Sequence, residues 1–239
     1  MDLHYKPFAV ITALVRAVAA LSLPPLRRVI AFSLGVSLIT FVLLWAAVGA
    51  FFYNIAFFCW RPLNWFVDLL GGFAVVALSW LLFPAVVTLT MSFFLDGVAA
   101  AVEASDYPGK GPPRPQSWGE IAALAWRLMA TTILLNLLAL PLYLLVPGIN
   151  LVLFLALNGY LFGWGYYEVV ALRRLDAAAA KRLRHRFAGQ IFLGGIVITG
   201  VFALPLVSLV APVIATAFMV HMFEALPRDA PPLAARPVG

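Results

Sequence analysis

The stretch Ala-Leu-Pro-Leu occurs twice in this chain, at residues 139–142 and again at residues 203–206. The first copy lies inside residues 128–167 and the second inside residues 187–223, and neither of these segments contains Asp, Glu, Lys or Arg. Each segment is about twice the roughly 20 residues that one helical crossing of a bilayer needs. Proline removes a backbone donor and clashes with the preceding helical turn, so it marks a break in each segment. The repeat therefore predicts two hairpins, each built from two apolar helices.

The turns of both hairpins are poor in polar residues. The first offers only Gly148 and Asn150, and the second only Ser208, whereas a turn in water usually carries several polar turn residues. Leu128–Leu140, the predicted first leg, is about 20 Å long at the helical rise, which is short of the roughly 30 Å hydrocarbon core. We therefore expect both hairpins to be hemi-penetrating, turning inside the membrane and leaving by the face they entered. Two fully spanning hairpins with short apolar turns are the alternative.

The composition places the chain in one class of protein. Of its 239 residues, 64% are hydrophobic and 11% charged, and the mean hydropathy is +1.01, whereas about a quarter of a soluble domain is charged. This predicts an all-α integral membrane protein with one membrane domain. The net charge of +6 is typical of Lys- and Arg-rich cytoplasmic loops, so we expect no nucleic-acid partner. The single cysteine, Cys59, excludes an intramolecular disulfide and a cysteine-rich metal site.

Two further uncharged runs, residues 29–60 and 69–95, predict two long transmembrane helices. A short alanine- and leucine-rich stretch before them, interrupted by Arg16, is typical of an interfacial helix rather than a cleavable signal peptide. Ser117 and Glu120 have the spacing of a capping box, so a helix is expected to start there. The predicted elements are an interfacial helix over 7–21, long helices over 26–60 and 69–104, hairpins over 119–172 and 178–225, and a disordered tail over 227–239, with residues 1–226 as the membrane domain.

The charges also predict an orientation. If each hairpin returns to its starting face and each long helix crosses once, fifteen of the 16 Lys and Arg residues lie on one side, and Arg61 alone lies on the other. The side rich in Lys and Arg is the cytoplasmic one. We therefore expect both termini to be cytoplasmic in a multi-pass protein of a bacterial inner membrane.

The segment Pro24–Arg28, Pro-Pro-Leu-Arg-Arg, is the first candidate site. Two prolines pre-set the entry to a helix, whose first turn presents unpaired N–H groups and the positive end of the helix dipole. Arg27 and Arg28 are electrostatically unfavourable there unless an anion binds, and backbone N–H groups with two guanidinium groups make a good oxyanion site. Pro25 and Leu26 complete this candidate anion site. The alternative is that the two arginines are topology anchors that contact lipid phosphates.

Polar residues in or beside the uncharged runs form a second candidate set, either lining a pathway or holding helices together. Asn136 and Asn158 lie at similar distances from the first turn, so they are predicted to hydrogen-bond across the hairpin. Glu168 is expected to pair with Arg173 or Arg174, and Glu224 with Arg228. Six glycines are expected to permit close helix packing. The set comprises Asp96, Asn136, Asn158, Glu168 and Glu224, with Asn54 in the first long helix, and the glycines are Gly159, Gly163, Gly165, Gly194, Gly195 and Gly200.

No catalytic motif is found in the sequence. His4, His185 and His221 are scattered, and there is no H-E-x-x-H, G-x-S-x-G or Walker lysine loop. We therefore predict no enzymatic activity, no catalytic residue, no cofactor and no metal site.

Five stretches carry a resemblance to a known family, and the resemblance covers about residues 7–226. They are Leu26–Arg28, Phe94–Asp96 leading to Val102-Glu103, Leu145–Leu151, Asn158–Tyr160 through Tyr167-Glu168, and Pro212 through Phe223-Glu224. In this order the chain resembles the CysZ-type sulfate permeases and the wider etoposide-induced-protein family. The resemblance implies two long transmembrane helices and two hemi-penetrating hairpins in a bacterial inner-membrane oligomer. It also implies sulfate uptake for cysteine synthesis without ATP.

In that family a Gly-Leu-Arg-type motif before the first long helix binds sulfate. Here Pro25 stands where the glycine would be, followed by Leu26, Arg27 and Arg28. The arginines match the motif, whereas the missing glycine changes the backbone part of the site.

The leading hypothesis is thus a sulfate permease or channel, passive or ion-coupled. Sulfite or other oxyanions are alternative substrates, and membrane lipid and further copies of the chain are the expected partners. The competing hypothesis is a non-transporting membrane scaffold, which predicts no saturable anion binding and lipid binding by the basic residues 181–186. An intramembrane enzyme ranks third.

Overall fold

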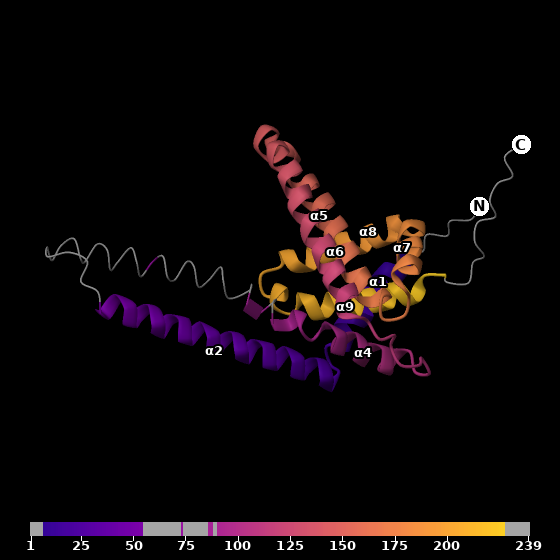
Figure 1. Cartoon of the computed structure of the whole chain (residues 1–239), viewed down its shortest axis with the longest axis horizontal. Helices are drawn as coiled ribbons and strands as arrows, with labels where there is room; N and C mark the ends of the chain where they lie inside the picture. The colour runs from indigo at the N-terminus through magenta and orange to yellow at the C-terminus, as the bar shows by residue number, and fades with distance from the viewer. Residues whose placement is uncertain (1–6, 55–72, 74–85, 88–89, 228–239) are drawn as a thin grey trace, which may run out of the picture.

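The computed structural model describes residues 7–54, 73, 86–87 and 90–227, and all regular secondary structure in this part of the chain is helical (Figure 1). Two helices are long and apolar enough to cross a membrane: α2 over residues Pro24–Leu43, and α5 over its full length. The predicted all-α membrane architecture is confirmed. The elements are α1 (Pro7–Ala20), α2 (Pro24–Asn54), α4 (Leu95–Asp106), α5 (Trp118–Leu145), η1 (Pro147–Ile149), α6 (Asn150–Ala171), α7 (Ala177–Arg186), α8 (Ala188–Ala203), η2 (Val207–Leu209) and α9 (Ala211–Ala225).

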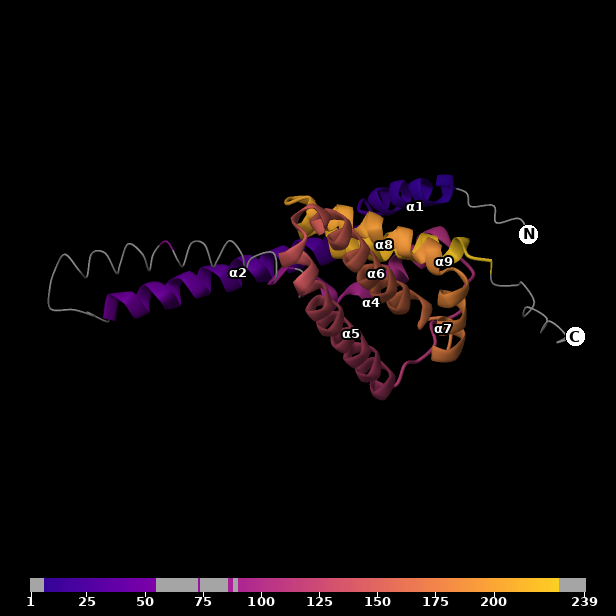
Figure 2. The same cartoon turned by 90° about the horizontal axis from the view of Figure 1, so that it is seen from above.

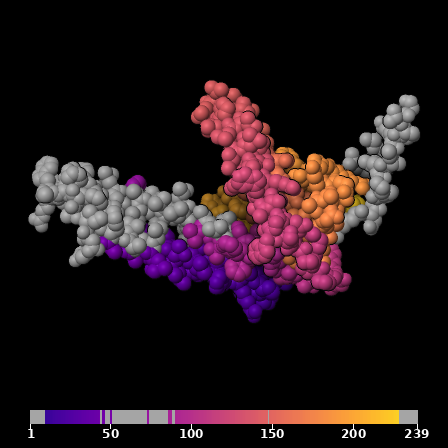
Figure 3. Space-filling model, in the orientation of Figure 1, coloured from indigo at the N-terminus to yellow at the C-terminus, as the bar shows by residue number. Residues whose placement is uncertain are grey.

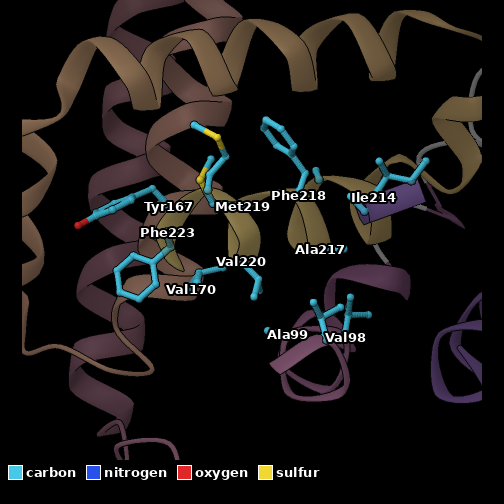
Figure 4. Packing of buried hydrophobic residues seen from close by; sticks show 14 of the residues in the cluster. Val98, Ala99, Tyr167, Val170, Ile214, Ala217, Phe218, Met219, Val220 and Phe223 are labelled. Carbon is cyan, nitrogen blue, oxygen red and sulfur yellow. The ribbon is translucent and has the colours of Figure 1, made fainter. Parts of the chain in front are cut away.

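The helix α9 is the centre of the molecule. Every residue from Ala211 to Phe223 is buried, because α9 is apolar on all sides and packs against α1, α4, α6 and α8. Figure 4 shows the α9 side chains Phe218 and Val220 between neighbouring helices, with Tyr167 of α6 and Val98 of α4 among the residues of the same cluster. The core therefore joins the second hairpin to the N-terminal helix and to the end of the first hairpin.

The helices α6 and α8 cross at three glycines. A Cβ on Gly195 would lie 1.8 Å from the carbonyl oxygen of Gly159, and a Cβ on Gly163 would lie 2.5 Å from that of Ile191. Both distances are far below the van der Waals contact distance, so the two backbones can approach this closely only because these positions lack a side chain. Gly200 differs, because within the described residues no atom lies within 4 Å of its would-be Cβ. The predicted close packing is confirmed for Gly159, Gly163 and Gly195 and is wrong for Gly200.

The turn end of the first hairpin, where α5 meets α6, projects from the body of the molecule (Figures 1 and 3). The predicted break at Pro141 is wrong, because α5 runs through this proline to Leu145 and the turn comes at η1. The helix α5 has 28 residues and α6 has 22, so they are about 42 Å and 33 Å long at the helical rise. The prediction of a leg of about 20 Å is therefore also wrong. Apolar side chains are exposed along most of α5.

The second hairpin has shorter legs and a real break. The helix α8 ends at Ala203, and the chain then turns through Pro205. The Ser208 N–H donates to the carbonyl of Leu204 at 2.7 Å, and the Ser208 hydroxyl donates to that of Pro205 at 2.6 Å. With 16 and 15 residues, α8 and α9 are about 24 Å and 23 Å long, and both are shorter than the roughly 30 Å hydrocarbon core.

The helix α2 extends away from the body as a long arm (Figure 2). It runs in a different direction from α5 and α6 in both views, so these helices cannot all follow the membrane normal. Further along, the chain turns at Phe93 and Phe94 before α4 begins at Leu95, at a point where a continuous helix over 69–104 was expected. The remaining predictions for residues 55–72, 74–85, 88–89 and 228–239 lie outside the described residues.

Candidate functional site

The candidate anion site lies at the corner between α1 and α2. The chain turns between the two helices with the Leu23 N–H bonded to the carbonyl of Ala20 at 2.9 Å. Leu26 is fully buried in the core, while Pro25, Arg27 and Arg28 are exposed. The buried side chain of Leu26 thus fixes the corner, and the guanidinium groups of Arg27 and Arg28 lie on its exposed surface.

The backbone contributes less to this site than the sequence suggested. The helix α2 begins at Pro24, so Pro24 and Pro25 occupy its first two positions and have no N–H to offer. The Arg27 N–H donates to the carbonyl of Leu23 at 3.1 Å. Leu26 is therefore the only residue before Arg27 in this turn that can offer a backbone donor. The expected set of several unpaired N–H groups is wrong, and the arginine side chains carry the positive charge of the corner.

Neither Arg27 nor Arg28 makes an ion pair with any residue that the structure describes. This separates them from the two arginines after α6, Arg173 and Arg174, which are paired with carboxylates. Two exposed, unpaired guanidinium groups on consecutive residues suit a doubly charged oxyanion, because each planar group can donate two parallel hydrogen bonds.

The largest group of ion pairs joins α4 to the turn after α6. Arg173 donates to Asp96 at 2.8 Å and to Glu103 at 3.2 Å, and Arg174 donates to Glu103 at 2.7 Å. Arg174 also donates to the carbonyl of Gly111 at 2.6 Å. The side chains of Glu103 and Arg173 are each only 5% exposed. These contacts fasten the base of the first hairpin to α4.

Opposing effects act on the Glu103 carboxyl, which lies in the charged helix α4 outside the uncharged segments. Burial raises its pKa, while the hydrogen bonds and charges of Arg174 and Arg173 lower it, and the net pKa is below the ordinary value. Glu103 is therefore ionised in the folded protein at neutral pH. Glu103 was not among the predicted site residues, although Val102-Glu103 belongs to one of the stretches that carry the family resemblance.

The predicted partners of Glu168 are wrong. Glu168 accepts a hydrogen bond from the Trp164 indole at 3.0 Å and lies 3.7 Å from the Nε of Arg184. Arg173 and Arg174 follow Glu168 by five and six residues, a spacing that does not bring side chains to one helix face. They lie in the turn after α6 and pair with α4 instead.

Other polar residues are also placed differently from the predictions. Glu224 pairs with Lys110 of the linker, and the predicted partner Arg228 lies outside the described residues. Nearby, the Tyr107 hydroxyl is 2.9 Å from the Nδ1 of His221. The linker before α5 is thus held to the end of α9 by two polar contacts, which were not visible in the sequence because the partners are more than a hundred residues apart.

The hydrogen bond predicted between Asn136 and Asn158 is wrong. Asn136 donates to the carbonyl of Thr132 at 2.8 Å, and Asn158 donates to that of Phe154 at 2.9 Å. Each amide is therefore satisfied by its own helix, four residues back, as is common for polar side chains in membrane helices. Neither amide holds the two legs of the first hairpin together.

The capping box predicted before α5 is confirmed. Ser117 accepts a hydrogen bond from the Glu120 N–H at 3.2 Å, and the Ser117 N–H donates to the Glu120 carboxylate at 3.3 Å. Arg114 donates to both oxygens of the same carboxylate, at 2.8 and 3.2 Å. Within the described residues, no group of three His, Cys, Asp or Glu side chains is placed to hold a metal ion.

The comparisons with known proteins point in one direction. The family model described as "Sulfate transporter CysZ/Etoposide-induced protein 2.4" matches residues 13–212. This range includes the corner between α1 and α2, the first hairpin and α8. None of the curated proteins matches the chain.

Proposed function

This chain belongs to the sulfate transporter CysZ/etoposide-induced protein 2.4 family, and on that premise we propose that it is a sulfate permease of the bacterial inner membrane. In this proposal it supplies sulfate for cysteine synthesis, by a passive or ion-coupled route and without enzymatic activity. Both termini lie in the cytoplasm, because the Lys and Arg residues are then almost all on that side. Sulfite and other oxyanions are the competing substrates.

One observation carries the proposal. Arg27 and Arg28 are adjacent, exposed and free of ion pairs with the described residues, on a corner fixed by the buried Leu26. Two like charges at a helix N-terminus are unfavourable by a few tenths of a kcal/mol or more, and a bound dianion reverses the sign of this interaction. The corner therefore binds sulfate through the two guanidinium groups, with Leu26 and Pro25 setting their position.

The path through the membrane is proposed to form between several copies of the chain. The exposed apolar faces of α2 and α5 suit contact with lipid and with neighbouring copies. The legs of the second hairpin are too short to cross the hydrocarbon core along the membrane normal, so this hairpin re-enters on the cytoplasmic side. The conduit then lies between the hairpins and the long helices of an oligomer.

A binding measurement tests the proposed site. Equilibrium dialysis of labelled sulfate against the purified protein is expected to show saturable binding, which Arg27→Ala/Arg28→Ala weakens at least about tenfold, since hydrogen bonds to charged groups contribute about 1.5–3 kcal/mol each. The matched control, Arg182→Ala/Arg186→Ala, removes two cations from α7 and should leave sulfate affinity unchanged.

If both double variants weaken sulfate binding equally, the protein attracts sulfate through its overall charge and not through a specific site at Arg27 and Arg28.

Growth of cells provides a second test. The parent gene should restore growth on sulfate to a bacterium that lacks sulfate uptake, and the Arg27→Ala/Arg28→Ala gene should not. Failure of both genes, with both proteins present in the membrane, would favour the scaffold hypothesis.

A further inference from the structure

A second positively charged site lies between α5, α6 and α7. It is a cavity of about 450 Å³, within the range of roughly 300–1,000 Å³ that holds small-molecule ligands. It is called the α5–α7 pocket below. The polar and aromatic side chains that line it are Glu120, Arg127, Trp164, Glu168, Lys181 and Arg184.

Both carboxylates of the α5–α7 pocket are already neutralised. Glu120 accepts two hydrogen bonds from Arg114, which does not line the cavity. Glu168 accepts from the Trp164 indole and pairs with Arg184 at 3.7 Å. The Arg184 guanidinium also lies 4.6 Å from the centre of the Trp164 ring. These contacts fix the wall of the cavity and neutralise both carboxylates that line it. The carboxylate of Asp176, at the N-cap of α7, is near Glu120 but does not line the cavity.

Two cations in the same wall remain without a counter-charge. Arg127 of α5 and Lys181 of α7 make no ion pair with any residue in the described part of the chain. The cavity therefore carries a net positive charge, supplied from two different helices. Two cations held on separate helices around a cavity can contact one anion from two sides.

The position of the pocket along the hairpin defines the kind of anion. Arg127 is the last charge before the uncharged residues 128–167, and Glu168 is the first charge after them. The cavity therefore lies where the first hairpin leaves the hydrocarbon, at the level of the lipid headgroups, and Trp164 is a residue type enriched at that level. Beyond it, α5 exposes Met129 and Ile133, which are 48% and 53% exposed, along a face on which acyl chains can lie.

We propose that the α5–α7 pocket binds the phosphodiester of an anionic phospholipid, with Arg127 and Lys181 contacting the phosphate and the acyl chains lying along α5. The cavity is large enough for a headgroup, it is positive, and it opens at headgroup level beside an apolar helix face. Basic pockets between membrane helices on the cytoplasmic side bind anionic headgroups by the same combination of features. The site is separate from the arginine corner of α2, and it would exist whether or not the chain transports sulfate.

Native mass spectrometry of the detergent-solubilised protein tests this site by titration with phosphatidylglycerol. The parent should bind one such lipid per chain more tightly than the rest. Arg127→Gln/Lys181→Gln should weaken this binding about 25-fold, at about fivefold for each cation near the headgroups. The control Arg182→Gln/Arg186→Gln removes two charges from α7 residues that do not line the cavity, and it should weaken binding less than threefold.

Two comparisons separate the sources of the phosphate. Phosphatidylcholine, which has the same phosphodiester but no net charge, should bind more weakly than phosphatidylglycerol, and inorganic phosphate in excess should not displace the lipid. Displacement by inorganic phosphate would overturn the lipid assignment in favour of a free anion. Equal weakening in the two double variants would overturn the pocket itself, since it would show diffuse attraction. Unchanged helicity by circular dichroism in each variant is the check on folding.

Discussion

The two hairpins contain the same tetrapeptide, Ala-Leu-Pro-Leu, and the structure uses it in two ways. In the first hairpin, Pro141 lies inside the continuous helix α5, and the chain turns only at Pro147. In the second, Pro205 lies in the turn itself, directly after α8 ends at Ala203. The α5 leg of the first hairpin is long and exposed, whereas the α9 leg of the second is buried on all sides.

The residue three positions after the proline explains why the helix continues through Pro141 but the chain turns at Pro205: it is Leu144 in the first hairpin and Ser208 in the second. Proline removes one helical hydrogen bond and leaves a carbonyl without its donor. Three residues after Pro205 is Ser208, whose hydroxyl donates to the carbonyl of Pro205 and so stabilises a turn. After Pro141 the equivalent residue is Leu144, which has no hydroxyl. Proline therefore permits a break in an apolar helix, and a nearby polar residue decides whether the chain turns there.

The largest effect is expected where the two hairpins touch. Gly195→Ala places a Cβ 1.8 Å from the carbonyl oxygen of Gly159, so one helix must move away from the other. We expect a loss of about 3 kcal/mol or more in the free energy of unfolding, at the upper end of the cost of overpacking. Gly200→Ala is the control, because no described atom lies within 4 Å of its new methyl group. Unfolding in detergent, followed by circular dichroism, compares the two variants, and equal stability would mean that α6 and α8 are not in contact.

A second effect concerns the base of the first hairpin. Glu103→Gln removes the charge that receives Arg173 and Arg174, and hydrogen bonds to charged groups contribute about 1.5–3 kcal/mol each. We therefore expect a loss of about 2 kcal/mol at neutral pH. The result to be measured is the melting temperature of the parent and the variant in one detergent, and no change would mean that α4 does not hold the hairpin base.

The same carboxyl predicts a pH dependence. Because the pKa of Glu103 is lowered from 4.5 in the folded protein, its contribution to stability is complete above that value and is lost as the pH falls from 4.5 through the lower folded pKa. The melting temperature of the parent should fall over that window. The fall should be smaller in Glu103→Gln, and parallel curves for the two proteins would contradict the assignment.

A smaller effect is expected at the second turn. Ser208→Ala removes the hydroxyl that bonds the carbonyl of Pro205, at a cost of about 1 kcal/mol. The reciprocal change, Leu144→Ser, places a hydroxyl three residues after Pro141 and should favour a break in α5 there, so the helicity measured by circular dichroism should fall below that of the parent. Unchanged helicity in Leu144→Ser, together with unchanged stability in Ser208→Ala, would contradict the explanation of the two prolines by Ser208.

Local patterns in the sequence predicted a good part of this fold. The uncharged segments predicted two helical hairpins, Ser117 and Glu120 predicted the start of α5, and the glycines of α6 and α8 predicted a close crossing. Each of these signals acts over a few residues or through the period of a helix. The length of α5 was not predicted, because the effect of Pro141 depends on the side chains that follow it.

The charged contacts could not be predicted for a different reason. Arg173 and Glu103 are 70 residues apart in sequence, and several carboxylates were available to the same arginine. The fold chooses among them, because α4 lies against the turn after α6 and Glu168 faces α7 instead. The α5–α7 pocket is a product of the same packing. The anion site at the two arginines of α2 stays a prediction, and it could be made from sequence because Arg27 and Arg28 are adjacent in the chain.

Uptake of labelled sulfate into proteoliposomes decides whether the chain transports sulfate and whether Arg27 and Arg28 bind it, with the parent and Arg27→Ala/Arg28→Ala reconstituted at equal density. We expect uptake by the parent that exceeds uptake by empty liposomes and falls when sulfite competes. Uptake by the double variant should be close to that of empty liposomes, because sulfate has lost its binding site. Sulfate flux by folded parent protein no greater than in empty liposomes would contradict the proposed transport.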